Sequence, residues 1–364
     1  MMLYKNTTET SATSVNFWRK LGRYTIMALL LCRIDGAVSA VADAIERPAI
    51  KSHLVEHSVL MAASYAGDHL IAVGERGLIL RSDDEGKSWQ QQPSPVSVTL
   101  TGVDFSDEKI GYAIGHGGIV LRTTNGGAEW KVLLDGRTLA QNLLQQAEAS
   151  KDEEAIYQAK LLVSDGPDKP FLDMLLLGPD HLIVVGAYGL ALETKDGGKT
   201  WGSWMGRIQN YFGFHLYSIR KQADRILIAG EQGFIALSKD NGQTFDILDT
   251  PYEGSFFTAQ LSGKSTLVLA GLRGNTFVSN NNGDVWESIK NPINASIFAS
   301  FMNGNGQVIM ANQAGILLGL TENRLVPLTR KRLPPLNNML EKANGSVLAL
   351  SINGPVSIDV GDLK

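Results

Sequence analysis

The sequence predicts an all-β protein, a seven-bladed β-propeller of four-stranded antiparallel blades with one helical insertion. Two observations lead to this fold class. A pair of turns, Gly-x-x-Gly followed by an Asp-box, recurs along the chain at a blade-like spacing. The chain also contains 38 glycines and is 44% hydrophobic without a long helical period, which is typical of turn-rich β proteins.

The clearest repeat occupies residues 186–201. Gly186-Ala-Tyr-Gly189 predicts a tight turn, and the residues from Leu190 to Glu193 alternate as in a strand. Thr194-x-Asp196-x-Gly198-x-Thr200-Trp201 is an Asp-box, whose hydroxyl and carboxylate groups can bond to local backbone N–H groups. Its tryptophan can fill the gap between neighbouring sheets. We therefore interpret the box as an architectural joint.

Four further copies follow the same pattern. The aromatic residues that close the five boxes are 41, 71, 44 and 41 residues apart: Trp89, Trp130, Trp201, Phe245 and Trp286. This is the period of a four-stranded blade, and the interval of 71 is one period plus an insertion. The blades are expected to begin near Val59, Thr101, Phe171, Phe214, Phe256, Ile297 and Asn337.

The sixth and seventh blades are less regular. Thr321-Glu-Asn-Arg324 replaces the sixth box, and the seventh repeat ends after three strands. We expect Ile45–Glu56 to supply the missing outer strand by pairing with Val356–Val360, which would join the chain ends and leave no open sheet edge. Six blades, or eight with a split blade, are the alternatives.

The insertion, residues 135–169, is predicted to be a helical hairpin. Leu139, Leu143 and Ala147 share one helical face, and a capping box at Ser150-x-x-Glu153 is expected to start the second helix. Because the insertion links two blades, we expect it to rise from the face that carries the Gly-x-x-Gly turns.

Residues 1–44 are predicted to be a signal peptide. Arg19, Lys20 and Arg23 precede a short apolar run, and the small residues before Ala40 or Ala44 fit a cleavage site. The remaining chain, 45–364, is expected to be the propeller, a soluble or peripheral periplasmic protein and a monomer. Cys32 is the only cysteine, so the exported chain would contain no disulfide.

The residue patterns argue against several functional classes. A formal charge of −4 without a basic stripe excludes a nucleic-acid footprint. The six histidines show no metal-binding spacing, and no nucleophile elbow or phosphate loop is present, so neither a cofactor nor an enzymatic activity is expected. A sialidase-like or glycan-binding propeller remains an alternative because of the boxes. Its Arg-Ile-Pro signature is matched only by Glu46-Arg-Pro48, however.

Propeller topology indicates where a binding site would lie. The Gly-x-x-Gly turns join the second and third strands of each blade and share one face. Large and varied residues at these turns suggest a surface for partner binding. The candidate residues are Arg76, His116, Tyr188, Gln232, Arg273 and Gln313.

The chain resembles the photosystem II stability and assembly factor family, in the form found in non-photosynthetic bacteria. The resemblance is carried by Lys169-Pro-Phe-Leu-Asp-Met174 with the turn and box that follow, Gly213-Phe-His-Leu-Tyr217 and Pro251-Tyr-Glu-Gly-Ser-Phe-Phe257, and it extends over roughly residues 50–360. It implies a propeller that binds a membrane-protein complex during assembly and catalyses nothing. The family's arginine-rich patch is matched here only by Arg76 and Arg273, and Glu75 and Glu231 lie beside or among these positions. An accessory role for an exporter of the resistance-nodulation-division type is the second possibility for the partner.

Overall fold

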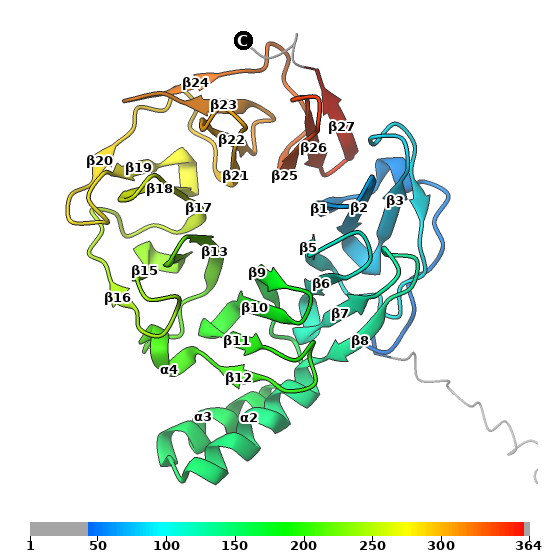
Figure 1. Ribbon diagram of the computed structural model, residues 1–364, viewed down its shortest axis with the longest axis vertical. Helices are drawn as coiled ribbons and strands as arrows, with labels where there is room; N and C mark the ends of the chain where they lie inside the picture. Colours follow the sequence, from blue (N-terminus) through cyan, green and yellow to red (C-terminus); the bar gives the residue numbers. More distant parts are fainter. Residues whose placement is uncertain (1–42, 360–364) are drawn as a thin grey trace, which may run out of the picture. The chain divides into compact units, whose positions relative to one another are not determined.

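A computed structural model describes residues 43–359, which lie in one compact unit, Asp43–Lys364. Seven antiparallel sheets surround a central channel, six with four strands and one with three (Figure 1). This confirms the seven-bladed propeller. Within residues 43–359, no helix is long and apolar enough to cross a membrane.

The strands of each blade follow one another from the channel outward. Blade one contains β1 (Leu60–Ala66), β2 (His69–Gly74), β3 (Ile79–Ser82) and β4 (Gln90–Gln91). Blade two contains β5 (Leu100–Phe105), β6 (Gly111–Gly115), β7 (Val120–Thr123) and β8 (Lys131–Leu134). Blade three contains β9 (Phe171–Gly178), β10 (His181–Gly186), β11 (Ala191–Thr194) and β12 (Gly202–Ser203). Blade four contains β13 (Leu216–Gln222), β14 (Arg225–Gly230), β15 (Ile235–Ser238) and β16 (Asp246–Ile247).

The remaining blades keep this order. Blade five contains β17 (Phe256–Ser262), β18 (Thr266–Gly271), β19 (Thr276–Ser279) and β20 (Glu287–Ser288). Blade six contains β21 (Ile297–Met302), β22 (Val308–Asn312), β23 (Leu317–Leu320) and β24 (Leu325–Pro327), and blade seven contains β25 (Leu336–Glu341), β26 (Val347–Ser351) and β27 (Gly354–Ile358). All seven inner strands begin within two residues of the predicted positions.

The core is divided into seven clusters of buried side chains, one between each pair of adjacent blades. The aromatic residues of the Asp-boxes belong to these clusters, as predicted. Trp130 of blade two packs with Ile71 of blade one, and Trp89 of blade one packs with Leu348 of blade seven. Each box therefore fastens its blade to the preceding one.

The predicted closing strand is wrong. Blade seven keeps three strands, and residues 44–52 run along the outer side of blade one instead. There the Ala44 carbonyl accepts a hydrogen bond from Ser97 N at 2.8 Å, and Ala49 N donates to the Ser94 carbonyl at 3.1 Å. Ile45 is buried in the cluster between blades one and two, which fixes the segment at this end. Only the short 3-10 helix η1 (Val55–His57) reaches β27.

Packing between the first and last blades closes the ring. Leu348 and Leu350 of blade seven join Leu60, Leu70 and Leu80 of blade one in a single cluster. Asn337 Nδ2 also donates to the Leu60 carbonyl at 2.9 Å.

The insertion forms the expected helical hairpin, α2 (Gly136–Ser150) and α3 (Glu153–Asp165). The predicted capping box is wrong, because Ser150 is the last residue of α2 and Asp152 caps α3 by accepting a hydrogen bond from Ala155 N. The insertion leaves the ring at the Gly-x-x-Gly face, as predicted, because α2 contacts the turn of blade two. Its helices then extend outside the ring next to β12 (Figure 1), where Leu139, Leu143 and Ala147 pack into the cluster between blades two and three.

Candidate functional site

The Gly-x-x-Gly turns form a repeated structure on one face of the ring. In the first five blades they are one-turn 3-10 helices: η2 (Glu75–Gly77), η3 (His116–Gly118), η4 (Ala187–Gly189), η5 (Glu231–Gly233) and η6 (Leu272–Gly274). The first N–H group of each turn donates to the carbonyl that precedes its inner strand, as Ala187 N does to Pro170 O at 3.0 Å. The turns are thus held against the mouth of the channel.

The first glycine of each motif is required by this contact. A Cβ atom on Gly186 would lie 2.2 Å from the Pro170 carbonyl oxygen, and the equivalent glycines meet the equivalent carbonyls at similar distances. A side chain at this position would force the turn away from the inner strand. The glycine pattern that identified the repeat therefore reflects close backbone approach.

The six predicted site residues are all exposed and occupy two positions of the turn. Four of them take the second position with left-handed backbone, at φ between 52° and 57°: Arg76, Tyr188, Gln232 and Arg273. His116 and Gln313 take the first position, because Gly117 holds the left-handed position in blade two. A left-handed residue other than glycine costs roughly 1–2 kcal/mol, so these side chains are kept at the ring face at some expense of stability.

Among the predicted site residues, Tyr188 is the centre of a side-chain cluster. The Lys169 ammonium lies 5.0 Å from its ring centroid, and the His215 ring centroid lies 5.1 Å from the same centroid. His215 Nδ1 is in turn 3.1 Å from Glu231 Oε2. His116 Nδ1 lies 3.9 Å from Asp168 Oδ1, whereas the side chains of Arg76, Arg273 and Gln313 form no hydrogen bond with one another. The structure therefore gathers the site at blades three and four, and it does not form a uniform ring.

The sequence reading missed two neighbouring residues, Tyr211 and Phe212. They lie in the link between blades three and four, after the short helix α4 (Met205–Ile208), and their side chains are 86% and 84% exposed. The Asn210 side chain closes this link by accepting from Phe214 N at 3.0 Å and donating to the Phe214 carbonyl at 2.7 Å. The link packs against the turn at Gly189, and Phe212 stacks on Phe214 with centroids 5.4 Å apart.

These side chains together form the aromatic patch: Tyr188, Tyr211, Phe212, Phe214 and His215. Large exposed aromatic groups on a turn fixed by its own hydrogen bonds are typical of binding surfaces, because little entropy is lost when a partner covers them. A sequence signal was present, since Asn210 and Gly213 bracket two adjacent aromatic residues in a link between blades.

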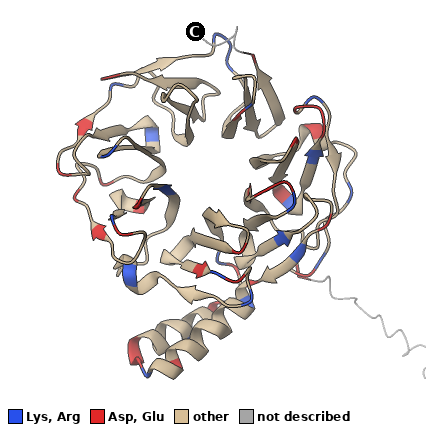
Figure 2. Cartoon of the chain, viewed as in Figure 1, with Lys and Arg blue, Asp and Glu red and all other residues tan. Residues whose placement is uncertain are grey.

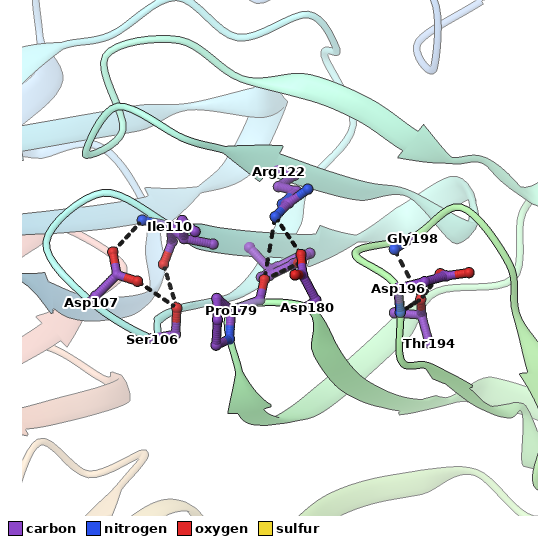
Figure 3. A network of polar contacts seen from close by, with 10 residues as sticks. Ser106, Asp107, Ile110, Arg122, Pro179, Asp180, Thr194, Asp196 and Gly198 are labelled. Atoms are coloured by element: carbon purple, nitrogen blue, oxygen red, sulfur yellow. Dashed lines mark hydrogen bonds and ion pairs between the residues drawn. The ribbon is translucent and has the colours of Figure 1, made fainter.

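On the opposite face, the polar side chains of the Asp-boxes form hydrogen bonds within their own turns. Figure 3 shows Thr194 Oγ1 bonded to Asp196 Oδ1 at 2.9 Å and accepting from Gly198 N at 2.9 Å. Hydrogen bonds from the hydroxyl and backbone of Thr200 are the main reason that the pKa of Asp196 falls to about 2. Asp84 and Asp240 have the same arrangement and the same low pKa, about 2. The boxes are therefore joints, as predicted.

Within residues 43–359, no group of three or more His, Cys, Asp or Glu side chains is placed to hold a metal ion. Lys and Arg are interspersed with Asp and Glu around the ring (Figure 2).

The fold and this surface define the class of the protein, a seven-bladed Asp-box propeller with an exposed aromatic site on the face opposite the boxes. The family model described as photosynthesis system II assembly factor YCF48 matches residues 50–161 and 156–315. The chain belongs to this family, which confirms the resemblance inferred from the sequence.

Individual relatives agree with this assignment. The photosystem II assembly lipoprotein Ycf48 of Synechococcus sp. (strain CC9902) is 32% identical over 97 residues, which cover 26% of this chain and 29% of that protein. The uncharacterized protein YkuO of Bacillus subtilis (strain 168) is 32% identical over 76 residues, covering 21% of this chain and 25% of YkuO. The matched segments thus span less than a third of either relative.

Solved structures show the same fold over nearly the whole propeller. A structure of YCF48 bound to D1 peptide has a TM-score of 0.63 at 16% identity and covers 86% of this chain and 99% of its own. YCF48 from Cyanidioschyzon merolae has a TM-score of 0.61 at 16% identity, covering 83% and 95%.

Proposed function

We propose that this protein is a non-catalytic assembly or docking factor of the periplasm, which binds a segment of a membrane-protein complex through its Gly-x-x-Gly face. The observation that carries the proposal is the rigid aromatic patch on that face, because Tyr211 and Phe212 are almost fully exposed without serving the core. Membership of the YCF48 family and the capture of a peptide by one of its members support the same role. The periplasmic part of the proposal rests on the export signal read in residues 1–44, nearly all of which lie outside the described residues.

Affinity capture with matched variants tests the binding role. The full chain, immobilised and exposed to detergent-solubilised membranes of its own host, should retain one membrane-protein complex, photosystem-like or exporter. The double variant Tyr211→Ser/Phe212→Ser should lose that complex. Val285→Ser is the control, since Val285 is also an exposed apolar residue but lies on an Asp-box turn. Equal capture by both variants would place the partner elsewhere on the ring.

The turn residues should contribute to the same binding. Tyr188→Ala and Arg273→Ala are each expected to weaken partner affinity by about 1–2 kcal/mol while the fold is retained, because Tyr and Arg supply much of the energy of protein interfaces. Titration of the purified partner against each variant measures this. Wild-type affinity in both would exclude the turns from the contact.

Export is tested separately. N-terminal sequencing of the protein from its host should find a mature start near Ile45 or Val41, and an intact Met1 in the cytoplasmic fraction would contradict the periplasmic proposal.

A further inference from the structure

The central channel contains a cavity of about 690 Å³, which lies in the size range of sites for small ligands and single side chains. Side chains of the inner strands line it, together with Gln313 of the turn that corresponds to Gly-x-x-Gly in blade six. None of the residues of the aromatic patch belongs to this lining, and the nearest approach between the two is that of His215 to Tyr217, with ring centroids 6.1 Å apart.

A β-bulge near the start of every inner strand shapes the mouth of the cavity. In each blade the register shifts after the first residue, which leaves the second residue without a partner on the adjacent strand. Such bulges re-aim side chains, and all seven unpaired residues line the cavity. Five are apolar or aromatic, namely Met61, Leu172, Tyr217, Phe257 and Phe298, and two are polar, Thr101 and Asn337.

The bulge residues give the two sides of the cavity different chemical character. In blades four to six they form a continuous aromatic wall. The rings of Tyr217 and Phe257 meet edge to face with centroids 5.2 Å apart, and Phe257 stacks on Phe298 at 4.8 Å. The polar bulge residues instead hold the ring together, as Thr101 Oγ1 does by donating to the Phe171 carbonyl at 2.6 Å. Only the aromatic side therefore offers ring faces and edges to a ligand.

A carboxylate stands on the opposite side of the ring. Blades one and two lie across the ring from blade five, and Asp104 lines the cavity beside Ser64 at a deeper level of the channel, three residues after the bulge residue of its own strand. Asp104 Oδ1 accepts from Ser64 Oγ at 2.9 Å and from Phe105 N at 2.9 Å, whereas no donor to Oδ2 is found among residues 43–359. Burial raises the pKa of this carboxyl, so a cation placed beside it would relieve an unfavourable charge.

The second carboxylate of the cavity is already neutralised. Asp173 accepts from Met174 N and Ile219 N, both at 2.9 Å, and forms an ion pair with Arg220. Arg220 also acts on Asp104, whose ionised form it favours and Asp173 disfavours. With Asp104 ionised, the three charged side chains of the cavity leave one net negative charge.

We propose that this cavity binds a cation carried on an apolar body, an ammonium or guanidinium group with an alkyl or aromatic stem. Aromatic rings attract cations through their faces and bury apolar stems, and the carboxylate on the other side supplies the counter-charge. Such a ligand is either a free organic cation or a lysine or arginine side chain inserted by a protein partner. This proposed ligand site depends only on the residues of the cavity, and it is additional to the docking role proposed for the aromatic patch.

Calorimetric titration of the full chain at pH 7 with phenethyltrimethylammonium tests the site. The cation should bind, and its neutral counterpart 3-phenylpropanol should bind at least about tenfold more weakly. Asp104→Asn and Phe257→Leu should each weaken cation binding by about tenfold, whereas Tyr217→Phe, which keeps an aromatic ring, should retain it. Asp68→Asn is the control for charge, because Asp68 lies in an exposed turn outside the cavity.

The source of the cation is distinguished by a second pair of probes, Nα-acetyl-lysine methylamide and its norleucine counterpart. Preference for the lysine compound over phenethyltrimethylammonium indicates a side chain of a partner, and the reverse indicates a free organic cation. Equal binding of each cation and its neutral counterpart, or wild-type binding by a folded Asp104→Asn protein, would overturn the proposal. Because Tyr211→Ser/Phe212→Ser leaves the cavity intact, its effect on partner capture is separable from this result.

Discussion

At the scale of single residues, close contacts between the Gly-x-x-Gly turns and the inner strands determine how side chains are presented on this face of the ring. Gly186 and its equivalents sit against carbonyl groups at the start of the inner strands, and the residues two positions later adopt left-handed backbone. This geometry presents side chains such as Tyr188 beside the channel mouth while the turn itself stays fixed. These exposed side chains are therefore positioned by glycines that pack against the backbone of the inner strands.

A pair of glycine substitutions checks this account. Gly186→Ala should lower the free energy of unfolding by about 1–3 kcal/mol, because its methyl group would overlap the Pro170 carbonyl. Gly206→Ala is the matched control. Gly206 lies in α4 with open space around it, so this change should be neutral or stabilising by up to about 1 kcal/mol. Urea unfolding of both variants measures the difference, and equal stabilities would contradict the account.

The Asp-box carboxylates predict an acid-sensitive stability. The pKa values of Asp84, Asp196 and Asp240 are lowered in the folded state from 3.8 to about 2. Their stabilising contribution is thus complete above the unfolded pKa and is lost as the pH falls from about 4 to about 2. We expect the melting temperature to drop over this window.

Boxes two and five supply the control for the acid effect, since they carry Asn125 and Asn281 in place of aspartate and keep the bond from the backbone N–H four residues further on. The triple variant Asp84→Asn/Asp196→Asn/Asp240→Asn should therefore fold, and its melting temperature should depend less on pH between about 2 and 4. An unchanged pH profile would show that other carboxylates cause the acid sensitivity.

At the scale of elements, the helical insertion is part of the core of blades two and three. Leu139 and Leu143 of α2 are buried there, and Gln146 Nε2 donates to the carbonyl of Trp201 at 2.9 Å. On α3, by contrast, Tyr157, Leu161 and Val163 are exposed. One helix is fixed to the ring, and the other presents an apolar surface to solvent.

Substitutions on the two helices should therefore have different effects. Leu143→Ala should cost about 2–4 kcal/mol of unfolding free energy because it leaves a cavity, and Leu161→Ala should cost less than about 1 kcal/mol. Deleting residues 138–164 should likewise lower the melting temperature, since it uncovers the apolar surface of blade three. A deletion variant as stable as the intact chain would show that the helices contribute no packing.

At the scale of the whole molecule, the ring is closed by side chains and not by a shared blade. The same kind of cluster that joins blades one and two also joins blades seven and one. Blade seven holds its place with three strands because Leu348 and Leu350 are fully buried against blade one.

This closure makes a further prediction. Leu348→Ala should destabilise the propeller by about 2–4 kcal/mol, and Asn337→Ala, which removes the bond to Leu60, by about 1 kcal/mol. Removing residues up to Lys51 should cost the burial of Ile45 but leave the ring closed, with an unchanged radius of gyration in solution scattering. A larger radius of gyration after that truncation would show that the N-terminal segment helps to close the ring.

The sequence by itself determined the repeat, and through it the fold. Glycines at close backbone contacts, box side chains that bond to their own turn, and an aromatic residue for each blade junction are local requirements, so they appear at a fixed period that can be read directly. The helical hairpin was equally readable from its apolar spacing, although Asp152 and not Ser150 caps its second helix, because either residue satisfies a capping pattern and only the backbone path selects one.

Only the tertiary structure decided which side chains come together between repeats. The path of residues 44–52 depends on where Ile45 is buried, and the orientation of the helices depends on the cluster between blades two and three in which Leu143 is buried. Likewise Tyr211 and Phe212 lie beside Tyr188 because the link packs on the Gly189 turn, and Asp104 shares a cavity with Phe257 because the inner strands of all blades line one channel. These arrangements join residues that are distant in the chain, and a local pattern carries no information about such contacts.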